Sequence, residues 1–566
     1  MKQVVVKLLK KALNKLKIDL KDEDLEKLIE TPPKLDMGDY SFPCFFMAEE
    51  LKMSPHEIAL ELRESIGNIP VTDLDDVQVI GGYINFFIAR KSLARQVIWD
   101  SIQKKKNFGK INIGNRKKIV VEFSSPNIAK PFGIGHLRST IIGNSIAKIC
   151  DFVGYKPVKI NYLGDWGTQF GKLVYGFEKY GSEDKLMKDP INHLLNIYIK
   201  VNKSKRNEKP SREAFKKLEQ RDKKSLMLWK IFRNLSVKEF EKVYEIFNID
   251  FDVYEGESDT IKYTKRVVEE LKQKKLLKKS KGALIVDLNE YGLGVCLIQK
   301  TDGTTLYATR DIAAAIKRYE KYKFEKMIYQ VGKEQELHFK QIFKVLELMG
   351  YEWAKNCIHS EHGLYLDKDK KKFATRKGKI VFMDEILKKT KSLAAKEIKK
   401  RFPKIKKSEM DERALKVAIA SIFYGDLKNN KKNNIVFDLK KFTSFEGNTG
   451  PYILYSYARA GSILKKADAK KITSKFSIPD LEEKEFELIK ALSQFSNNVL
   501  ESFTHLNPSF IANYCYQISQ KFNEFYQSCP VIKSDSSMFR LALVESFRQI
   551  LRNALRLLGI EALEEM

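Results

Sequence analysis

A helical segment between two short apolar segments constrains the fold of this chain more than any other feature. Residues 119–123 are apolar and end in a Ser-Ser-Pro-Asn turn, a helix is expected over residues 135–153, and residues 158–162 are apolar again. Gly154 follows the helical pattern and marks its end. Because parallel strands need a long crossover between them, strand, helix and strand in this order predict an α/β fold with a doubly wound parallel sheet.

The helix and strand patterns divide the 566 residues into three predicted domains. Residues 1–105 predict a small α/β domain, with helices over residues 2–20 and 54–66 and strands over residues 77–80 and 83–88. The sheet domain is predicted over residues 116–400. A polar, lysine-rich stretch interrupts it and predicts a helical insertion at about residues 183–255. Residues 410–566 show only helical periodicity and predict an all-helical domain.

The charge of the chain is strongly unbalanced, with 103 Lys and Arg residues against 73 Asp and Glu residues and a net charge of +30 at pH 7. This excess predicts a polyanionic partner, and nucleic acid fits it better than an anionic membrane surface. A basic, solvated surface without a partner is the alternative. No apolar run is long enough to span a bilayer, so we expect no membrane association.

The cysteine and histidine residues argue against a disulfide framework and against a metal centre. The six cysteines contain no CxxC pair, which fits a reducing cytosol. His359 and His362 form an HxxH pattern without other ligands at suitable spacing, and we expect them to be loop residues. We therefore expect a cytoplasmic protein with no dedicated metal site, although the basic amphipathic start is also compatible with an organelle.

The segment from Ser124 to Ser139 links the first apolar strand to a helix N-terminus and predicts a nucleotide site. Its glycines let backbone N–H groups approach an anion, the helix dipole favours phosphate, and His136 can donate to a phosphate oxygen. Lys130 and Arg138 flank the turn and strengthen this interpretation. The alternative is a tight turn followed by a histidine at the start of a helix.

The segment from Glu122 to Ser139 resembles the arginyl-tRNA synthetase family, whose HIGH signature corresponds to Gly133-Ile134-Gly135-His136. Further similar segments follow in the family's order at residues 161–171, 306–311, 335–338, 375–378, 445–452 and 558–561. The resemblance spans nearly the whole chain. It implies a class I, Rossmann-like catalytic domain, an N-terminal add-on domain that touches tRNA and a helical C-terminal anticodon-binding domain.

Two positions depart from the family's pattern. The first histidine of HIGH, which in the family helps to hold the ATP phosphates or the reacting carboxylate, is Gly133 here, so its loss would slow activation or shift this role to backbone N–H groups. The second signature stands as Lys372-Phe373-Ala374-Thr375-Arg376 and lacks the usual second lysine. In the family a lysine just before HIGH compensates for this loss, and Lys130 stands at that position.

The resemblance places arginine among five residues, namely Glu122, Asn127, Tyr307, Asp311 and Gln335. The residue types agree with this, because a planar guanidinium requires carboxylates in a fork geometry. Asp311 follows Tyr307 by four residues, with a helix expected from about residue 311; alternatively Asp311 only favours a helix start and Tyr307 packs in the sheet. Glu122 ends a buried strand, where an unpaired carboxylate is costly and a cationic ligand would stabilise it. A solvated carboxylate at the sheet edge is the alternative for Glu122.

The resemblance also implies which residues bind ATP and which stabilise the reacting groups. ATP binding falls to Ser125, Pro126, Gly133, Gly135, His136, Thr375 and Lys377. Catalysis falls to Lys130, Gly133, Gly135, His136, Lys372 and Arg376. From the residues alone, the lysine run around Lys372 favours a solvated surface over a catalytic role.

The activity implied by the resemblance is that of an arginine–tRNA ligase. Such an enzyme joins L-arginine to ATP, with Mg²⁺ accompanying ATP as a substrate complex, and transfers arginine to the 3′ end of tRNA(Arg). We expect a monomer. Two alternatives remain: a catalytically weak or silent paralogue that binds RNA, and a related HxGH nucleotidyltransferase acting on a small molecule.

Overall fold

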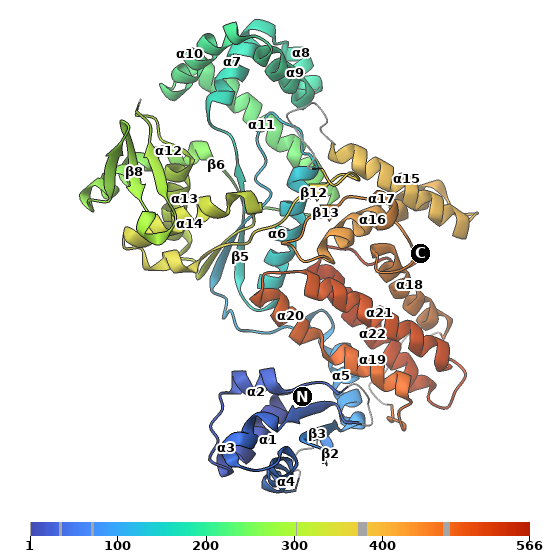
Figure 1. The fold of residues 1–566 in the computed structure, drawn as a ribbon. Coiled ribbons are helices and arrows are strands. Elements are labelled where there is room, and N and C mark those ends of the chain that lie inside the picture. Colours follow the sequence, from blue (N-terminus) through green and yellow to red (C-terminus); the bar gives the residue numbers. More distant parts are fainter. Residues whose placement is uncertain (1, 33–36, 69–72, 302, 372–381, 468–475) are drawn as a thin grey trace. The chain divides into compact units, whose positions relative to one another are not determined.

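The computed structural model describes residues 2–32, 37–68, 73–301, 303–371, 382–467 and 476–566 (Figure 1). Its backbone contacts divide the chain into two compact units. The first contains residues 1–108, 460–494 and 520–550, and the second contains residues 109–459, 495–519 and 551–566. No helix in the described ranges is both long enough and apolar enough to cross a membrane.

The first unit begins with an antiparallel sheet of three strands in the order β1-β3-β2. The strands are β1 (Tyr40–Pro43), β2 (Leu74–Ile80) and β3 (Tyr83–Ile88), and the helices of this part are α1 (Lys2–Lys15), α2 (Asp22–Leu28), α3 (Ala48–Leu51), α4 (Pro55–Ile66) and α5 (Arg90–Lys104). The predicted helix over residues 54–66 and both predicted strands are confirmed. A capping box at Ser54, with Glu57 reaching back to its N–H, begins α4.

The first helix is shorter than predicted. It ends at Lys15 rather than residue 20, because Lys17 adopts a left-handed conformation with φ of 62°. The N–H of Ile18 then donates to the carbonyl of Leu13 at 3.0 Å, which closes the helix end.

The second unit is built around a parallel sheet of five strands in the order β11-β10-β4-β5-β6. The strands are β4 (Lys118–Glu122), β5 (Lys156–Leu163), β6 (Val253–Gly256), β10 (Lys326–Tyr329) and β11 (Cys357–His359). The chain runs outward from β4 through β5 to β6, then returns to β10 on the other side of β4. This order confirms the predicted doubly wound sheet, and the order reverses between β4 and β10. Such a reversal point opens a crevice at the carboxyl ends of the strands, where ligands bind.

Helix α6 (Ile134–Phe152) crosses from β4 to β5 and is buried on nearly every face. It approaches the end of β4 closely, because a Cβ atom at Gly143 would lie only 2.2 Å from the Cβ atom of Phe123. Its position is also held by Arg138, whose Nε lies 3.2 Å from Asp426 Oδ2 with both side chains 1% exposed. Asp426 lies on α16 (Lys407–Leu427), so this ion pair joins α6 to a helix far along the chain.

Helices fill the predicted insertion, with α7 (Thr168–Tyr180) before it and α8 (Glu183–Lys188), α9 (Pro190–Asn202), α10 (Glu208–Glu219) and α11 (Lys223–Ile246) within it. Its last residues, 253–255, lie instead in β6 of the central sheet. An antiparallel sheet follows α12 (Glu257–Gln273) and contains β7 (Leu277–Ser280), β8 (Ala283–Asp287) and β9 (Val295–Gln299).

The remainder of the chain is mostly helical. Its elements are α13 (Tyr307–Tyr322), α14 (Glu336–Leu348), α15 (Met383–Arg401), α17 (Leu439–Phe442), α18 (Gly450–Lys466), α19 (Glu483–Ser493), α20 (Phe495–Thr504), α21 (Ser509–Ser528) and α22 (Ser537–Leu557), with the short parallel pair β12 (Tyr365–Leu366) and β13 (Ile435–Val436). The domain predicted to be all-helical, residues 410–566, also contains a two-residue strand at Ile435–Val436, which the helical periodicity did not indicate because its partner lies at residues 365–366. Helix α13 begins four residues before the predicted start, so Tyr307 lies on a helix and not in the sheet.

The buried ion pair between Arg138 and Asp426 makes a prediction about stability. Replacing Asp426 with Ala leaves a buried guanidinium without its counter-charge, and we expect a loss of about 3–5 kcal/mol in the free energy of unfolding. Urea unfolding followed by circular dichroism measures it. The matched control is Glu320→Ala, which removes an exposed pair with Arg266 and is expected to cost about 1 kcal/mol or less. Equal losses in the two variants would contradict the assignment.

Candidate active site

A pocket of about 380 Å³ opens among residues that follow the carboxyl ends of the central strands. It is lined by six residues that the sequence predicted, namely Glu122, Ser125, Asn127, Tyr307, Asp311 and Gln335, and by eight others: Tyr162, Leu163, Gly164, Glu257, Tyr329, Val331, His338 and Phe339. The structure therefore brings together all five residues predicted to bind arginine and one predicted to bind ATP. They come from β4 and the loop that follows it, from α13 and from the segment after β10.

The loop after β4 has a strained backbone that shapes one wall of the pocket. Ser124, Ser125 and Ala129 have φ angles of 72°, 49° and 58°, which non-glycine residues adopt rarely. Hydrogen bonds hold this conformation: the N–H of Ser124 donates to Ser139 Oγ at 3.0 Å, and the N–H of Ala129 donates to Ser236 Oγ at 2.9 Å. Strain that the surroundings maintain in this way is typical of functional sites.

Asn127 and Pro126 fix this loop against the end of β5. The N–H of Gly164 donates to the carbonyl of Pro126 at 3.1 Å, and a Cβ atom at Gly164 would lie 2.3 Å from Asn127 Oδ1. Gly164 is therefore required for the close approach of the two segments. Pro126, which was predicted to bind ATP, does not line the pocket and contributes through its backbone.

Three carboxylates, Glu122, Glu257 and Asp311, line the same pocket. Burial raises the pKa of Glu122 to about 7, against the opposing effect of Arg318. Burial likewise raises the pKa of Glu257 to about 7, against the opposing effect of Arg310. The charge of Asp311 raises both values further, so a cation bound among the three groups would be stabilised by all of them.

Glu122 is not the unpaired carboxylate that the sequence analysis assumed. Its side chain forms a buried ion pair with Arg318, and Glu257 pairs with Arg310. That assumption was wrong because Arg318 lies 196 residues further along the chain, on α13. The alternative of a solvated carboxylate at the sheet edge is also wrong, because Glu122 is 4% exposed in a central strand.

Asp311 and Tyr307 lie one helical turn apart on α13, and both line the pocket. Asp311 Oδ2 accepts a hydrogen bond from His338 Nε2 at 2.7 Å, which orients the carboxylate. Tyr307 is 60% exposed, and the guanidinium of Arg310 lies 5.2 Å from its ring centroid. The alternative in which Tyr307 packs in the sheet is therefore excluded.

Several lining residues, Ser125 and Tyr329 among them, carry hydroxyl oxygens that the described residues leave without a hydrogen-bond partner. Ser125 Oγ and Tyr329 Oη are both buried and form no hydrogen bond within the part of the chain that the structure describes. Buried polar atoms are nearly always paired, so unpaired ones beside a pocket indicate a place for ligand atoms.

The HIGH-like segment lies at the N-terminus of α6, with Gly133 at the N-cap. His136 Nδ1 accepts a hydrogen bond from the N–H of Gly133 at 3.3 Å. Burial, followed by the charge of Lys130, lowers the pKa of His136 to about 4, so the imidazole is neutral with its proton on Nε2. Gly135 is exposed, and a Cβ atom there would meet nothing within 4 Å. Lys130, Gly133, Gly135 and His136 do not line the pocket described above.

The remaining predicted residues, Lys372, Thr375, Arg376 and Lys377, lie outside the described residues. Asp165, in the segment that resembles the family's second block, has a structural role. Its carboxylate accepts hydrogen bonds from Arg233 Nε at 3.0 Å and Ser258 Oγ at 2.8 Å. Trp166 is buried and packs edge-on against Trp229.

Glu257, His338 and Tyr329 are pocket residues that sequence reasoning missed. Glu257 follows β6, which the sequence analysis had included in the helical insertion, so no strand end pointed to it. His338 belongs to the segment 335–338 that resembles the family, and its spacing from Gln335 is the signal that was available.

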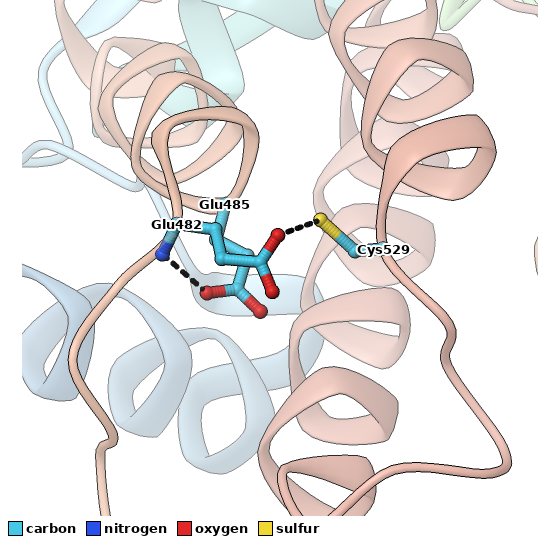
Figure 2. A group of neighbouring side chains, drawn as sticks. All are labelled: Glu482, Glu485 and Cys529. Atoms are coloured by element: carbon cyan, nitrogen blue, oxygen red, sulfur yellow. Dashed lines mark hydrogen bonds between the residues drawn. The ribbon is translucent and has the colours of Figure 1, made fainter.

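One cluster of possible metal ligands occurs among the described residues, and its contacts are those of an ion pair. Figure 2 shows Glu482, Glu485 and Cys529, whose ligand atoms lie within 4.8 Å of one another. Arg540 pairs with both carboxylates, and its Nε lies 2.7 Å from Glu485 Oε1. Burial raises the pKa of the Cys529 thiol to about 12, which disfavours the thiolate that a metal needs.

The HxxH histidines are engaged by backbone carbonyls. His359 lies in β11, not in a loop as predicted, and its Nε2 donates to the carbonyl of Val331 at 3.3 Å. His362 Nδ1 donates to the carbonyl of Gly363 at 2.8 Å.

Three family models together match most of the chain. The class I (R) tRNA synthetase catalytic domain matches residues 98–439, the DALR anticodon-binding domain matches residues 453–566, and the arginyl-tRNA synthetase N-terminal domain matches residues 3–88.

Similar sequences and solved structures agree with these family models. The arginine–tRNA ligase of Clostridium perfringens is 43% identical over 557 residues, which cover 97% of this chain and 98% of that protein. The corresponding ligase of Clostridium acetobutylicum is 42% identical over 568 residues, 99% of each. The arginyl-tRNA synthetase structures from Thermus thermophilus and Plasmodium falciparum share this fold. Their TM-scores are 0.83 and 0.84, each is 24% identical, and each comparison covers 100% of this chain, with 100% and 99% of the other. The chain therefore belongs to the arginyl-tRNA synthetase family of class I tRNA synthetases.

Proposed function

We propose that the chain is an arginine–tRNA ligase, which activates L-arginine with ATP and transfers it to the 3′ end of tRNA(Arg). The observation that carries this proposal is the convergence of Glu122, Glu257 and Asp311 on one pocket beside the reversal point of a parallel sheet. A guanidinium offers five donors in a plane, and two or more carboxylates around it satisfy both its charge and its hydrogen bonds. The comparisons favour the ligase over a silent paralogue or a small-molecule nucleotidyltransferase.

Arginine lies with its guanidinium toward Asp311 and Glu257. Asp311 is oriented by His338, Glu257 is held by Arg310, and the Tyr307 hydroxyl is available beside them. Asn127 and Gln335 hold the end of the substrate that carries the α-amino group, and Glu122 adds a negative charge near it.

ATP binds on the side of α6. The helix N-terminus offers backbone N–H groups to phosphate, and neutral His136 donates from Nε2 to a phosphate oxygen. Lys130 adds positive charge, and Gly135 leaves space for close approach of the nucleotide. Ser125 contributes its buried hydroxyl, and Pro126 shapes the loop. Mg²⁺ accompanies ATP as part of the substrate.

Lys372, Thr375, Arg376 and Lys377 complete the site in this proposal. Their positive charges stabilise the leaving pyrophosphate.

The reaction needs no covalent intermediate on the protein. A carboxylate oxygen of arginine attacks the α-phosphorus of ATP in line, and pyrophosphate leaves. A terminal ribose hydroxyl of tRNA then attacks the arginyl carbonyl, and AMP leaves. Positioning and charge stabilisation supply the rate.

In this scheme the N-terminal domain (residues 1–105) and the helical C-terminal domain (residues 410–566) bind tRNA, and the catalytic domain (residues 116–400) carries out the reaction. The net charge of +30 supports phosphate contacts, which position the tRNA without reading its sequence. We propose a monomer that acts in the cytoplasm.

Charging of a tRNA pool with labelled arginine tests the function directly, and Gly133→His tests the missing first histidine. Gly133 has an extended backbone, with φ of −110° and ψ of 173°, that any residue adopts. We expect the wild type to charge tRNA with arginine. We expect Gly133→His to change the charging rate by less than about tenfold, because backbone N–H groups and His136 already stabilise the developing charge. Loss of a donor that the reaction depends on typically costs about 10²–10³-fold. An inactive wild type that the histidine restores would instead indicate an RNA-binding relic.

The carboxylates on α13 and α12 make a second prediction. Asp311→Asn and Glu257→Gln should each raise the KM for arginine by about 10²-fold or more, because a charge-assisted hydrogen bond to the guanidinium is lost. The KM for ATP should change by less than about threefold, since these residues lie on the arginine side. Glu320→Gln, on the same helix but exposed, is the control. A parallel loss of ATP binding would contradict the assignment.

The pH dependence follows from the carboxylates with raised pKa values. Glu122 and Glu257 must be ionised to bind the cation, and their pKa values near 7 in the free protein mean that protons compete with arginine below about pH 7. We therefore expect kcat/KM for arginine to fall as the pH is lowered from 8 to 6, while bound arginine shifts the limb of kcat to lower pH. Profiles of the two parameters that coincide would contradict this.

A further inference from the structure

Arg318 does not line the pocket, but it contacts two residues that do, Glu122 and Tyr162. It lies on α13 two helical turns after Asp311, and its side chain is 1% exposed. Nη1 donates to Glu122 Oε2, and Nε donates to Glu255 Oε2 at 2.9 Å. The guanidinium carbon also lies 4.7 Å from the ring centroid of Tyr162. The three partners belong to β4, β6 and β5, so one side chain reaches three adjacent strands.

The contact with Arg318 uses only one of the two carboxylate oxygens of Glu122. Arg318 holds Oε2, whereas Oε1 accepts no hydrogen bond from any residue in the described ranges. Glu122 itself lines the pocket. The ion pair therefore fixes the orientation of the carboxylate and leaves one oxygen for a ligand.

The charges around Glu122 make Arg318 decisive for its ionisation. The groups that face it are Arg318 and Asp311 on α13, Glu255 on β6 and Tyr329 on β10. Burial, Asp311 and Glu255 all raise the pKa of Glu122, and Arg318 lowers it. Without Arg318, a carboxyl with only like charges near it would be protonated at neutral pH.

We propose that Arg318 is a positioning residue for amino-acid binding, which keeps Glu122 charged and presents its second oxygen to a cationic group of the substrate. The inference rests on the proposed function, because it takes arginine as the occupant of the pocket. Arg318 itself does not touch the substrate. Its effect is therefore specific to the amino acid and absent for ATP.

Arg318→Met and Arg318→Lys test this, with Lys317→Met as the matched control. Lys317 is the neighbouring residue, it pairs with Glu255 as well, and it makes no contact with Glu122. Charging of tRNA is measured over pH 6–9, with separate KM values for arginine and ATP. In Arg318→Met we expect the KM for arginine to rise at least about tenfold at pH 7 and the acidic limb of kcat/KM to move to higher pH, because the pKa of Glu122 rises.

The other variants separate positioning from a merely structural role. Arg318→Lys retains a cation and should recover part of the arginine affinity, and Lys317→Met should resemble the wild type. The double variant Glu122→Gln/Arg318→Met should bind arginine no worse than Glu122→Gln alone, because Arg318 acts through Glu122. If Arg318→Met does not fold, the proposal is tested with Arg318→Lys and with the double variant. The double variant leaves no buried charge unpaired.

Several outcomes would overturn the proposal. KM values for arginine and ATP that rise equally, losses that add in the double variant, or an unshifted pH limb would each show that Arg318 does not act through Glu122. If the wild type charges tRNA normally and Arg318→Met behaves like the wild type, only the positioning role is overturned. A wild type that does not charge tRNA with arginine would overturn the proposed function, and the positioning role with it.

Discussion

A carboxylate inside the central sheet requires a cation buried beside it, and Arg318 supplies that cation to both Glu122 and Glu255. Without it, Glu122 would be a buried charge with no counter-ion, at a cost of several kcal/mol, and Glu255 would keep only its pair with Lys317. Because Arg318 reaches from α13 to three strands, the same contact holds α13 against the sheet. Tyr307 and Asp311 lie on that helix, so the placement of the pocket's acidic wall depends on this ion pair.

Another wall of the pocket depends on a strained turn. Ser124 and Ser125 adopt left-handed backbone conformations directly after β4, and the buried contact of Ser124 Oγ with Tyr244 Oη at 2.7 Å helps to maintain them. The turn lets the chain enter α6 with Gly133 at the N-cap, so that the N-terminus of α6 offers free N–H groups to an anion. The cost of the strain is offset by burial of nearly the whole of α6, which Gly143 permits by its close approach to Phe123.

The local patterns in the sequence predicted the strands and helices around the site well, because each depends on nearby residues. The apolar runs at residues 119–123 and 158–162 correspond to β4 and β5, and the helix over residues 135–153 corresponds to α6. The five residues predicted to bind arginine do converge on one pocket. Where the prediction of an element was wrong, the cause was a local conformation without a periodic signal, as at Lys17, or a strand of four residues hidden after an insertion, as in β6.

The sequence by itself determined the fold class, since apolar periodicity is a property of short segments. Through the family resemblance it also named six of the residues that line the pocket, whereas eight others were not predicted. Only the tertiary structure decided the charge balance of the pocket. It paired Glu122 with Arg318 across 196 residues, brought Glu257 beside Asp311, and set His338 against the Asp311 carboxylate. These contacts join segments far apart in the chain. Their strength comes from burial, which no local sequence pattern reports.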